Sequence, residues 1–105
     1  MIRATVMYPN GADARFDHEY YRTKHLPLVK AKLGPRGLIR AEVDRGLAGG
    51  DGGPPPLVGA MHLFFESVET FQKAMGEVGA ELIADVPNYT NTAFQIQVSQ
   101  VVDVG

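Results

Sequence analysis

The 105-residue chain contains neither cysteine nor tryptophan. The lack of cysteine excludes disulfide bridges, thiolate metal sites and a cysteine nucleophile. A strong excess of either charge is also missing, because the net charge is −2, and the basic residues are scattered along the chain. Nucleic-acid binding needs a basic surface, so we expect no nucleic-acid partner.

Long apolar runs are absent as well. No segment reaches the ~20 apolar residues that a membrane helix needs, and the N-terminal MIRATVMYPNG meets a turn too early for a secretory signal. We therefore expect no membrane partner and a cytoplasmic location. The chain also lacks GxGxxG, GxxxxGK[ST], GxSxG and HExxH, so the sequence predicts neither a bound metal nor a cofactor.

What is present fits one folded domain covering residues 1–105. Hydrophobic residues make up 45% of the chain and charged residues 21%, which is typical of a globular protein. A chain of this length forms one core.

The apolar pattern predicts six elements in the order β-α-β-β-α-β. Strands are expected at 2–8, within 36–47, at 57–66 and at 92–104, and helices at 17–33 and after a Ser67 cap, with an apolar stripe that reaches Val86. This order predicts an α+β, ferredoxin-like fold, in which a four-stranded antiparallel sheet carries both helices on one face.

The strand at 57–66 is apolar on both alternating faces, which is typical of a strand buried on both sides. Because the predicted helices cover one face of the sheet, we expect a second copy of the chain to cover the other. The sequence therefore predicts a homodimer. The preceding segment 48–56 is rich in glycine and proline and is expected to be a flexible surface connection.

The first predicted helix begins within the segment FDHEYYRTKHLPLV, where Asp17 is the expected N-cap and Phe16 and Tyr21 form a hydrophobic staple. Pro27 lacks an N–H group, so we expect the helix to kink or break near His25. Tyr21 and His25 share one helical stripe with apolar residues, and this predicts that the imidazole points toward the core.

His25 has two interpretations. It is a packed core histidine, or it is a general acid or base, because an imidazole exchanges protons near neutral pH. His18 lies in a polar helix start and is expected at the surface. His62 is in mid-strand and faces either the helices or the dimer interface.

Aromatic residues supply the remaining candidates for ligand contact. Tyr8 and Tyr21 are expected to flank one cavity between helix and sheet, and Tyr21 is also a candidate catalytic residue. The predicted ligand-binding set is Tyr8, Tyr20, His62, Phe64 and Tyr89. Asp85 and Asn88 look like ordinary loop residues.

The pattern F-D-x-x-Y-Y-x-x-x-H-x-P-L at 16–28, with A-D-V-P-N-Y-T-N at 84–91, resembles the EthD family. That family is named for a protein needed in ethyl tert-butyl ether degradation and is similar to the dimeric α+β barrel proteins. The resemblance implies two sheets packed face to face, with a pocket between each sheet and its helices. His25 is the residue that matches the family motif.

These observations lead to a hypothesis with two alternatives. The preferred one is a cofactor-independent isomerase, cyclase or decarboxylase that acts on a small apolar or aromatic oxygenated compound. His25 would move a proton, and Tyr21 or Tyr8 would stabilise an enolate. A non-enzymatic, stress-associated or ligand-binding dimer is the first alternative, and a cofactorless monooxygenase is the second.

Overall fold

The computed structural model describes residues 1–104, and it has the predicted β-α-β-β-α-β order. Strands β1 (Ile2–Pro9), β2 (Arg40–Arg45), β3 (Leu57–Phe65) and β4 (Gln95–Gln100) form one sheet in the order β2-β3-β1-β4. Every neighbouring pair of strands is antiparallel. The ferredoxin-like fold is confirmed.

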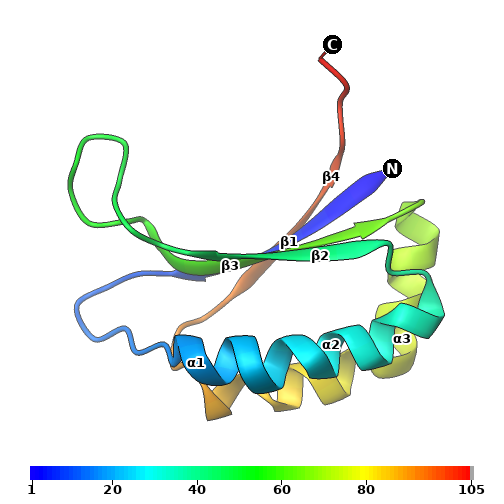
Figure 1. Cartoon of the computed structure of the whole chain (residues 1–105), viewed down its shortest axis with the longest axis horizontal. Coiled ribbons are helices and arrows are strands. Elements are labelled where there is room, and N and C mark those ends of the chain that lie inside the picture. Colours follow the sequence, from blue (N-terminus) through cyan, green and yellow to red (C-terminus); the bar gives the residue numbers. More distant parts are fainter. Residues whose placement is uncertain (105) are drawn as a thin grey trace.

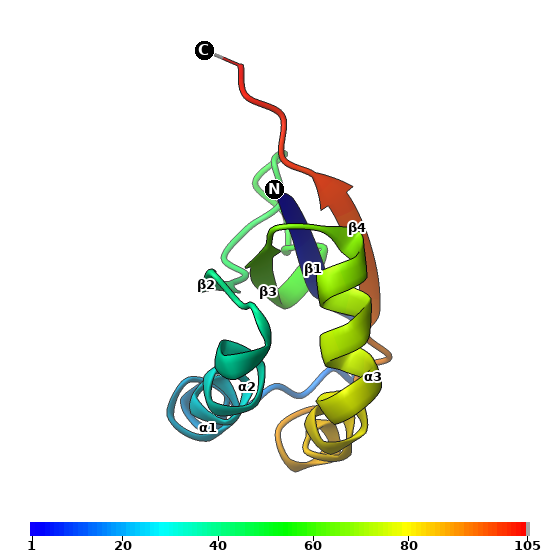
Figure 2. The same ribbon diagram turned by 90° about the vertical axis from the view of Figure 1, so that its right-hand side faces the viewer.

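Both long helical segments lie on the same side of the sheet (Figures 1 and 2). The first consists of α1 (His18–Tyr20), a π-helical turn (Tyr21–His25) and α2 (Leu26–Leu33). The second is α3 (Val68–Ala84). Short 3-10 turns follow α2 at Gly34–Arg36 and α3 at Val86–Asn88.

The helix starts follow the predicted signals. The Asp17 carboxylate accepts a hydrogen bond from the Tyr20 amide at 3.0 Å, and the Ser67 hydroxyl accepts one from the Thr70 amide at 3.2 Å. The rings of Phe16 and Tyr21 lie 4.9 Å apart, as the predicted staple requires. These caps fix where each helix enters the layer beneath the sheet.

The core lies between this sheet face and the helices. Its buried members come from β1, the π-helical turn, α2, β3, α3 and the segment after α3, while β2 and β4 contribute none. The buried members are Ile2, Ala4, Tyr8, Tyr21, Val29, Leu33, Met61, Leu63, Phe65, Phe71, Ala74, Val78, Leu82 and Tyr89. Because α3 does not fully cover the edge strand β4, Ile96 and Val98 remain 39% and 37% exposed.

The last strand is shorter than the sequence predicts. It ends at Gln100 rather than continuing to 104, and the segment that follows leaves the sheet (Figure 1). Val102 and Val104 continue the alternating pattern of β4, but they have no strand beside them and are largely exposed. Alternation alone does not extend a strand where hydrogen-bonding partners are missing.

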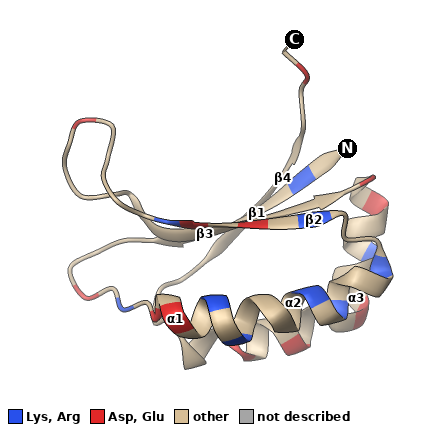
Figure 3. Cartoon of the chain, in the orientation of Figure 1, with Lys and Arg blue, Asp and Glu red and all other residues tan. Residues whose placement is uncertain are grey.

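The other sheet face differs from the apolar surface that β3 alone suggests. Ala60 and Phe64 of β3 are buried on it, so β3 is indeed covered on both sides. Its neighbours, however, present polar and charged side chains there, among them Arg3, Thr5, Arg40, Glu42, Asp44 and Gln97. Charges of both signs lie along β2 (Figure 3). We refer to this side as the open face.

Candidate functional site

The candidate site is a cluster of polar side chains between the sheet and the helices. Tyr8 comes from β1, Tyr21 and His25 come from the π-helical turn, and Asp85 and Tyr89 come from the segment after α3. The exposed fractions of Tyr8, Tyr21, His25 and Tyr89 are 4% or less. Side chains that are as far apart in the sequence as Tyr8 and Tyr89 are therefore joined in one largely buried network.

The π-helical turn is the local feature that positions Tyr21 and His25. The Leu26 amide donates to the Tyr21 carbonyl, five residues back, and helical geometry then resumes without a break. Pro27 explains the wide turn, because its ring clashes with the carbonyl four residues earlier and it donates no hydrogen bond. The expected kink thus takes the form of a π turn. It stacks the rings of Tyr21 and His25 at 5.2 Å.

His25 forms a buried pair with Asp85. The imidazole Nδ1 lies 2.9 Å from the Asp85 Oδ2, and the two side chains are 5% and 14% exposed. A bare Nδ1 would face a carboxylate oxygen, so Nδ1 carries the proton and donates it to Asp85. In the neutral imidazole, this leaves the lone pair on Nε2.

Asp85 is held by three donors. Its Oδ1 accepts from the Tyr20 hydroxyl at 2.7 Å and from the Asn88 side-chain amide at 2.9 Å. Burial acts to raise the pKa of Asp85, but the hydrogen bonds from Asn88, His25 and Tyr20 outweigh it and lower that pKa. Asp85 is therefore an anion at neutral pH.

Three tyrosine hydroxyls continue the network from the other side of the imidazole. The Tyr89 hydroxyl lies 3.4 Å from His25 Nε2 and 2.6 Å from the Tyr8 hydroxyl. The Tyr21 hydroxyl donates to Tyr8 at 3.3 Å. Burial raises the pKa of Tyr21, Tyr89 and Tyr8, so all three remain protonated at neutral pH.

A cavity of about 40 Å³ adjoins this cluster. Tyr8 and His25 are the polar-tipped residues in its wall, and every other lining residue is apolar: Val6, Val29, Met61, Leu63, Met75, Leu82, Ile83, Val86, Phe94 and Ile96. An apolar chamber with a few polar groups at one end is typical of a small-molecule site.

The segment 85–91 also anchors the loop that precedes the first helix. The Asn91 side chain accepts from the Arg15 amide at 2.8 Å and donates to the Asp13 carbonyl at 2.9 Å. The Thr90 hydroxyl donates to the Arg15 carbonyl at 2.7 Å. These bonds tie the two halves of the site together, and they give the V-P-N-Y-T-N stretch a structural role beyond that of Tyr89.

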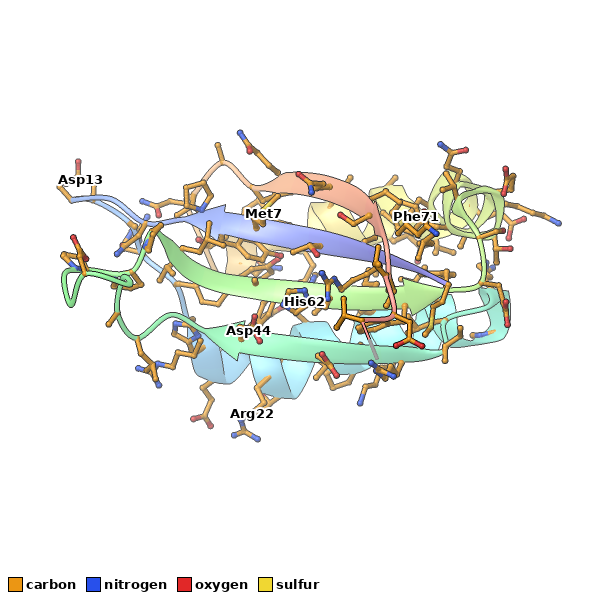
Figure 4. The ribbon with its side chains drawn as sticks, turned by 90° about the horizontal axis from the view of Figure 1, so that it is seen from above. Met7, Asp13, Arg22, Asp44, His62 and Phe71 are labelled. Carbon is orange, nitrogen blue, oxygen red and sulfur yellow. The ribbon has the colours of Figure 1, made fainter. Side chains whose placement is uncertain are left out.

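The predicted site residues divide between two places. Tyr8, Tyr21, His25 and Tyr89 converge, and Tyr20 reaches the cluster through Asp85. His62 and Phe64 do not converge with them, because they lie on the open face. Figure 4 shows His62 beside Asp44 on that face, and His62 Nε2 lies 2.6 Å from Asp44 Oδ2. Its Nδ1 lies 3.2 Å from the Thr5 hydroxyl.

Asp85 is the site residue that sequence reasoning missed. An aspartate before Val-Pro-Asn is ordinary in a loop, and its 60-residue separation from His25 gives no local spacing to detect. The available signal was its place in the second stretch of the A-D-V-P-N-Y-T-N pattern. Asn88, which holds Asp85, was missed for the same reason.

Within residues 1–104, no three or more acidic or histidine side chains gather in a way that would hold a metal ion. None of the described helices combines the length and the apolar character that crossing a bilayer requires.

The model of the EthD domain matches residues 9–93. An uncharacterized 11.0 kDa protein from the thcB–thcC intergenic region of Rhodococcus erythropolis is 32% identical over 92 residues, which are 87% of this chain and 85% of that protein.

Solved structures agree. An EthD-like protein from Ralstonia eutropha JMP134 is 43% identical, with 99% of this chain and 94% of that one covered, at a TM-score of 0.90. An ethyl tert-butyl ether D family protein from Bacillus halodurans C-125 is 17% identical, with 97% and 99% covered, at a TM-score of 0.69. The second likeness shows the fold alone.

Proposed function

The chain belongs to the EthD family, and from this premise we propose that it binds a small apolar or aromatic oxygenated compound and transfers a proton to or from it. The reaction would be isomerisation, cyclisation or decarboxylation of an enolisable substrate. The ligand would occupy the cavity beside Tyr8 and His25, and His25 would be the proton acceptor and donor once the ligand displaces the 3.4 Å contact of the Tyr89 hydroxyl with Nε2.

The observation that carries this proposal is the buried His25–Asp85 pair at the wall of an apolar cavity. A carboxylate that fixes the Nδ1–H tautomer leaves Nε2 as the basic atom and stabilises the imidazolium once Nε2 is protonated. A purely structural histidine needs one acceptor for its ring N–H, which a backbone carbonyl supplies, and one donor for its other nitrogen. It does not need a carboxylate that three donors hold in place.

The tyrosines supply the second part of the chemistry. Their raised pKa values keep the hydroxyl protons in place, so they can donate to an oxyanion but do not act as bases near neutral pH. A preorganised donor of this kind stabilises a developing enolate by about 3 kcal/mol. Tyr8 is placed for this role, since it lines the cavity.

Deuterium exchange into cyclopentanone tests the proposal without knowledge of the natural substrate. The wild-type protein in D₂O should speed exchange at the carbons next to the carbonyl, as followed by proton NMR. A His25→Gln variant should lose this effect, and the His62→Gln variant should keep it. If the wild-type protein binds the ketone without speeding exchange, the non-enzymatic binding module is the better description.

A homodimer belongs to the same proposal. The open face has no helical cover within residues 1–104, so two copies could pack against each other through it. The charged neighbours of Ala60 and Phe64 make the contact more polar than the sequence suggests. Sedimentation velocity at micromolar concentration should give the mass of two chains, and a single-chain mass would refute the homodimer.

A further inference from the structure

The hydroxyls and the imidazole form one directed chain of hydrogen bonds that ends on Asp85. We propose that the protonation state of His25 sets whether Tyr8 accepts or donates a hydrogen bond at the cavity, and so whether the site prefers a hydroxyl-bearing ligand or takes a carbonyl-bearing one as well. This inference rests on the proposed function, because it assigns the ligand chemistry of the same cavity.

With a neutral imidazole, each hydroxyl and ring proton in this series of hydrogen bonds has one acceptor. Nδ1–H donates to Asp85, and Nε2 then accepts from the Tyr89 hydroxyl. The Tyr89 oxygen in turn accepts from Tyr8, and the Tyr8 oxygen accepts from Tyr21. A hydroxyl has one donor and two acceptor positions. Tyr8 therefore retains one lone pair, which would accept from a ligand O–H.

Protonation of Nε2 reverses part of the chain. The imidazolium donates to the Tyr89 oxygen, so the Tyr89 proton turns toward Tyr8. The Tyr8 oxygen then accepts from both Tyr89 and Tyr21, and both of its lone pairs are used. Its proton has no partner within the cluster and would donate to a ligand carbonyl or oxyanion.

Among the types of side chain in this hydrogen-bonded network, imidazole is the one that ordinarily changes charge between pH 5 and 8. Asp85 contacts it from the end of α3, Tyr89 from the following segment and Tyr21 from its own turn, while Tyr8 on β1 lies one hydrogen bond further. The lowered pKa of Asp85 keeps it anionic, and the raised pKa values of the tyrosines keep them neutral. Arg22 and Lys24 on the same turn are exposed.

Cyclopentanol and cyclopentanone are a matched pair of probes that differ in hydrogen-bonding character at one oxygen. Their affinities for the wild-type protein are measured at about pH 8.5 and about pH 5, which bracket the range in which imidazoles titrate. The readout is the shift of the methyl NMR signals of Met75, Ile83 and Ile96, which line the cavity.

The alcohol-to-ketone affinity ratio should fall by about tenfold as the pH is lowered, because the ketone gains one hydrogen bond from Tyr8, whereas the alcohol oxygen can pair with Tyr8 in either state. Tyr89→Phe interrupts the chain and leaves the Tyr8 proton free at every pH. That variant should favour the ketone under both conditions, with no pH dependence. His62→Gln changes the histidine outside the chain, and it should behave as the wild type does.

The contrary results separate two failures. If both probes bind with a ratio that does not change with pH, or if Tyr89→Phe keeps the wild-type change, the switch is wrong and the proposed cavity survives. If neither probe moves the cavity methyl signals, while circular dichroism shows the fold intact, the proposed function fails together with this inference.

Discussion

A histidine lies beside an aspartate on each side of the sheet, and the two pairs differ in their distance and in their exposure to water. On the helix side, His25 and Asp85 are 2.9 Å apart, with side chains 5% and 14% exposed. On the open face, His62 and Asp44 are closer, at 2.6 Å, but their side chains are 20% and 60% exposed. The shorter distance belongs to the pair that water screens more.

This difference shows that surroundings, rather than separation, give a titratable pair its consequences. Water stabilises Asp44 whether or not His62 is present, so breaking that pair costs little. Asp85 is enclosed by Tyr20, Asn88 and His25, and losing one donor leaves a carboxylate with few other partners. His25 of the helix-side pair also lines the apolar cavity.

The largest effect should come from truncating the two histidines in parallel. His25→Ala leaves Asp85 without its imidazole partner and opens space in the core, so we expect a loss of about 2–4 kcal/mol in the free energy of unfolding. His62→Ala should cost about 1 kcal/mol or less. Urea denaturation measures both. Equal losses would show that the two environments do not differ in the way described.

High pH should unfold the helix side through its tyrosines. A group whose pKa is higher in the folded than in the unfolded chain lowers stability as the pH rises past its unfolded value, which is about 10 for tyrosine. Tyr21 and Tyr89 both have strongly raised pKa values. The melting temperature should fall steeply above that pH. Tyr21→Phe should make the fall shallower, and an unchanged slope would contradict this account.

Low pH should remove the contribution of Asp85 to the stability of the fold. Because its pKa is lowered in the folded chain, its contribution to stability is complete above its unfolded value, about 4, and is lost as the pH falls through the folded value. Asp85→Asn should have a lower melting temperature at neutral pH, and the difference from wild type should shrink in acid. A constant difference down to pH ~2 would place the titrating group elsewhere.

The smallest effect is expected on the open face. Asp44→Asn removes an exposed charge beside His62, and the free energy of unfolding should change by less than about 1 kcal/mol at low salt. At ~1 M salt the change should become smaller, because the Debye length falls to about 3 Å, close to the separation of the two side chains. Thermal denaturation at the two salt concentrations measures it. This expectation holds for the single chain, and a loss that persists at high salt would instead agree with the proposed homodimer, in which two packed sheets would bury this pair.

Much of the helix side could be predicted from sequence because its signals are local. The Asp17 cap, the Phe16–Tyr21 staple and the proline after His25 act within one or two helical turns. The open face could not be predicted from β3 alone, since its character depends on which strands flank it. Charged β2 is the neighbour that makes the difference.

The site was predictable in part for the same reason. The stripe that holds Tyr21 and His25 follows from helical spacing, and Tyr8 follows from its place at the end of β1. The link to Asp85 spans 60 residues and depends on how α3 ends. No periodicity encodes such a contact, so only the fold brings the carboxylate to the imidazole.

The π-helical turn also affects how the chain tolerates changes in length. A wide turn holds one more residue than an α-helical turn does, so deleting one residue from 22–24 would let the segment relax to ordinary helix. Because the wide turn absorbs the surplus residue, the residues on both sides of the deletion would keep their phase relative to each other, whereas the same deletion in α3 would rotate all that follows by about 100°. The π-helical turn is therefore the place where this helix can lose one residue without turning one of its ends against the other.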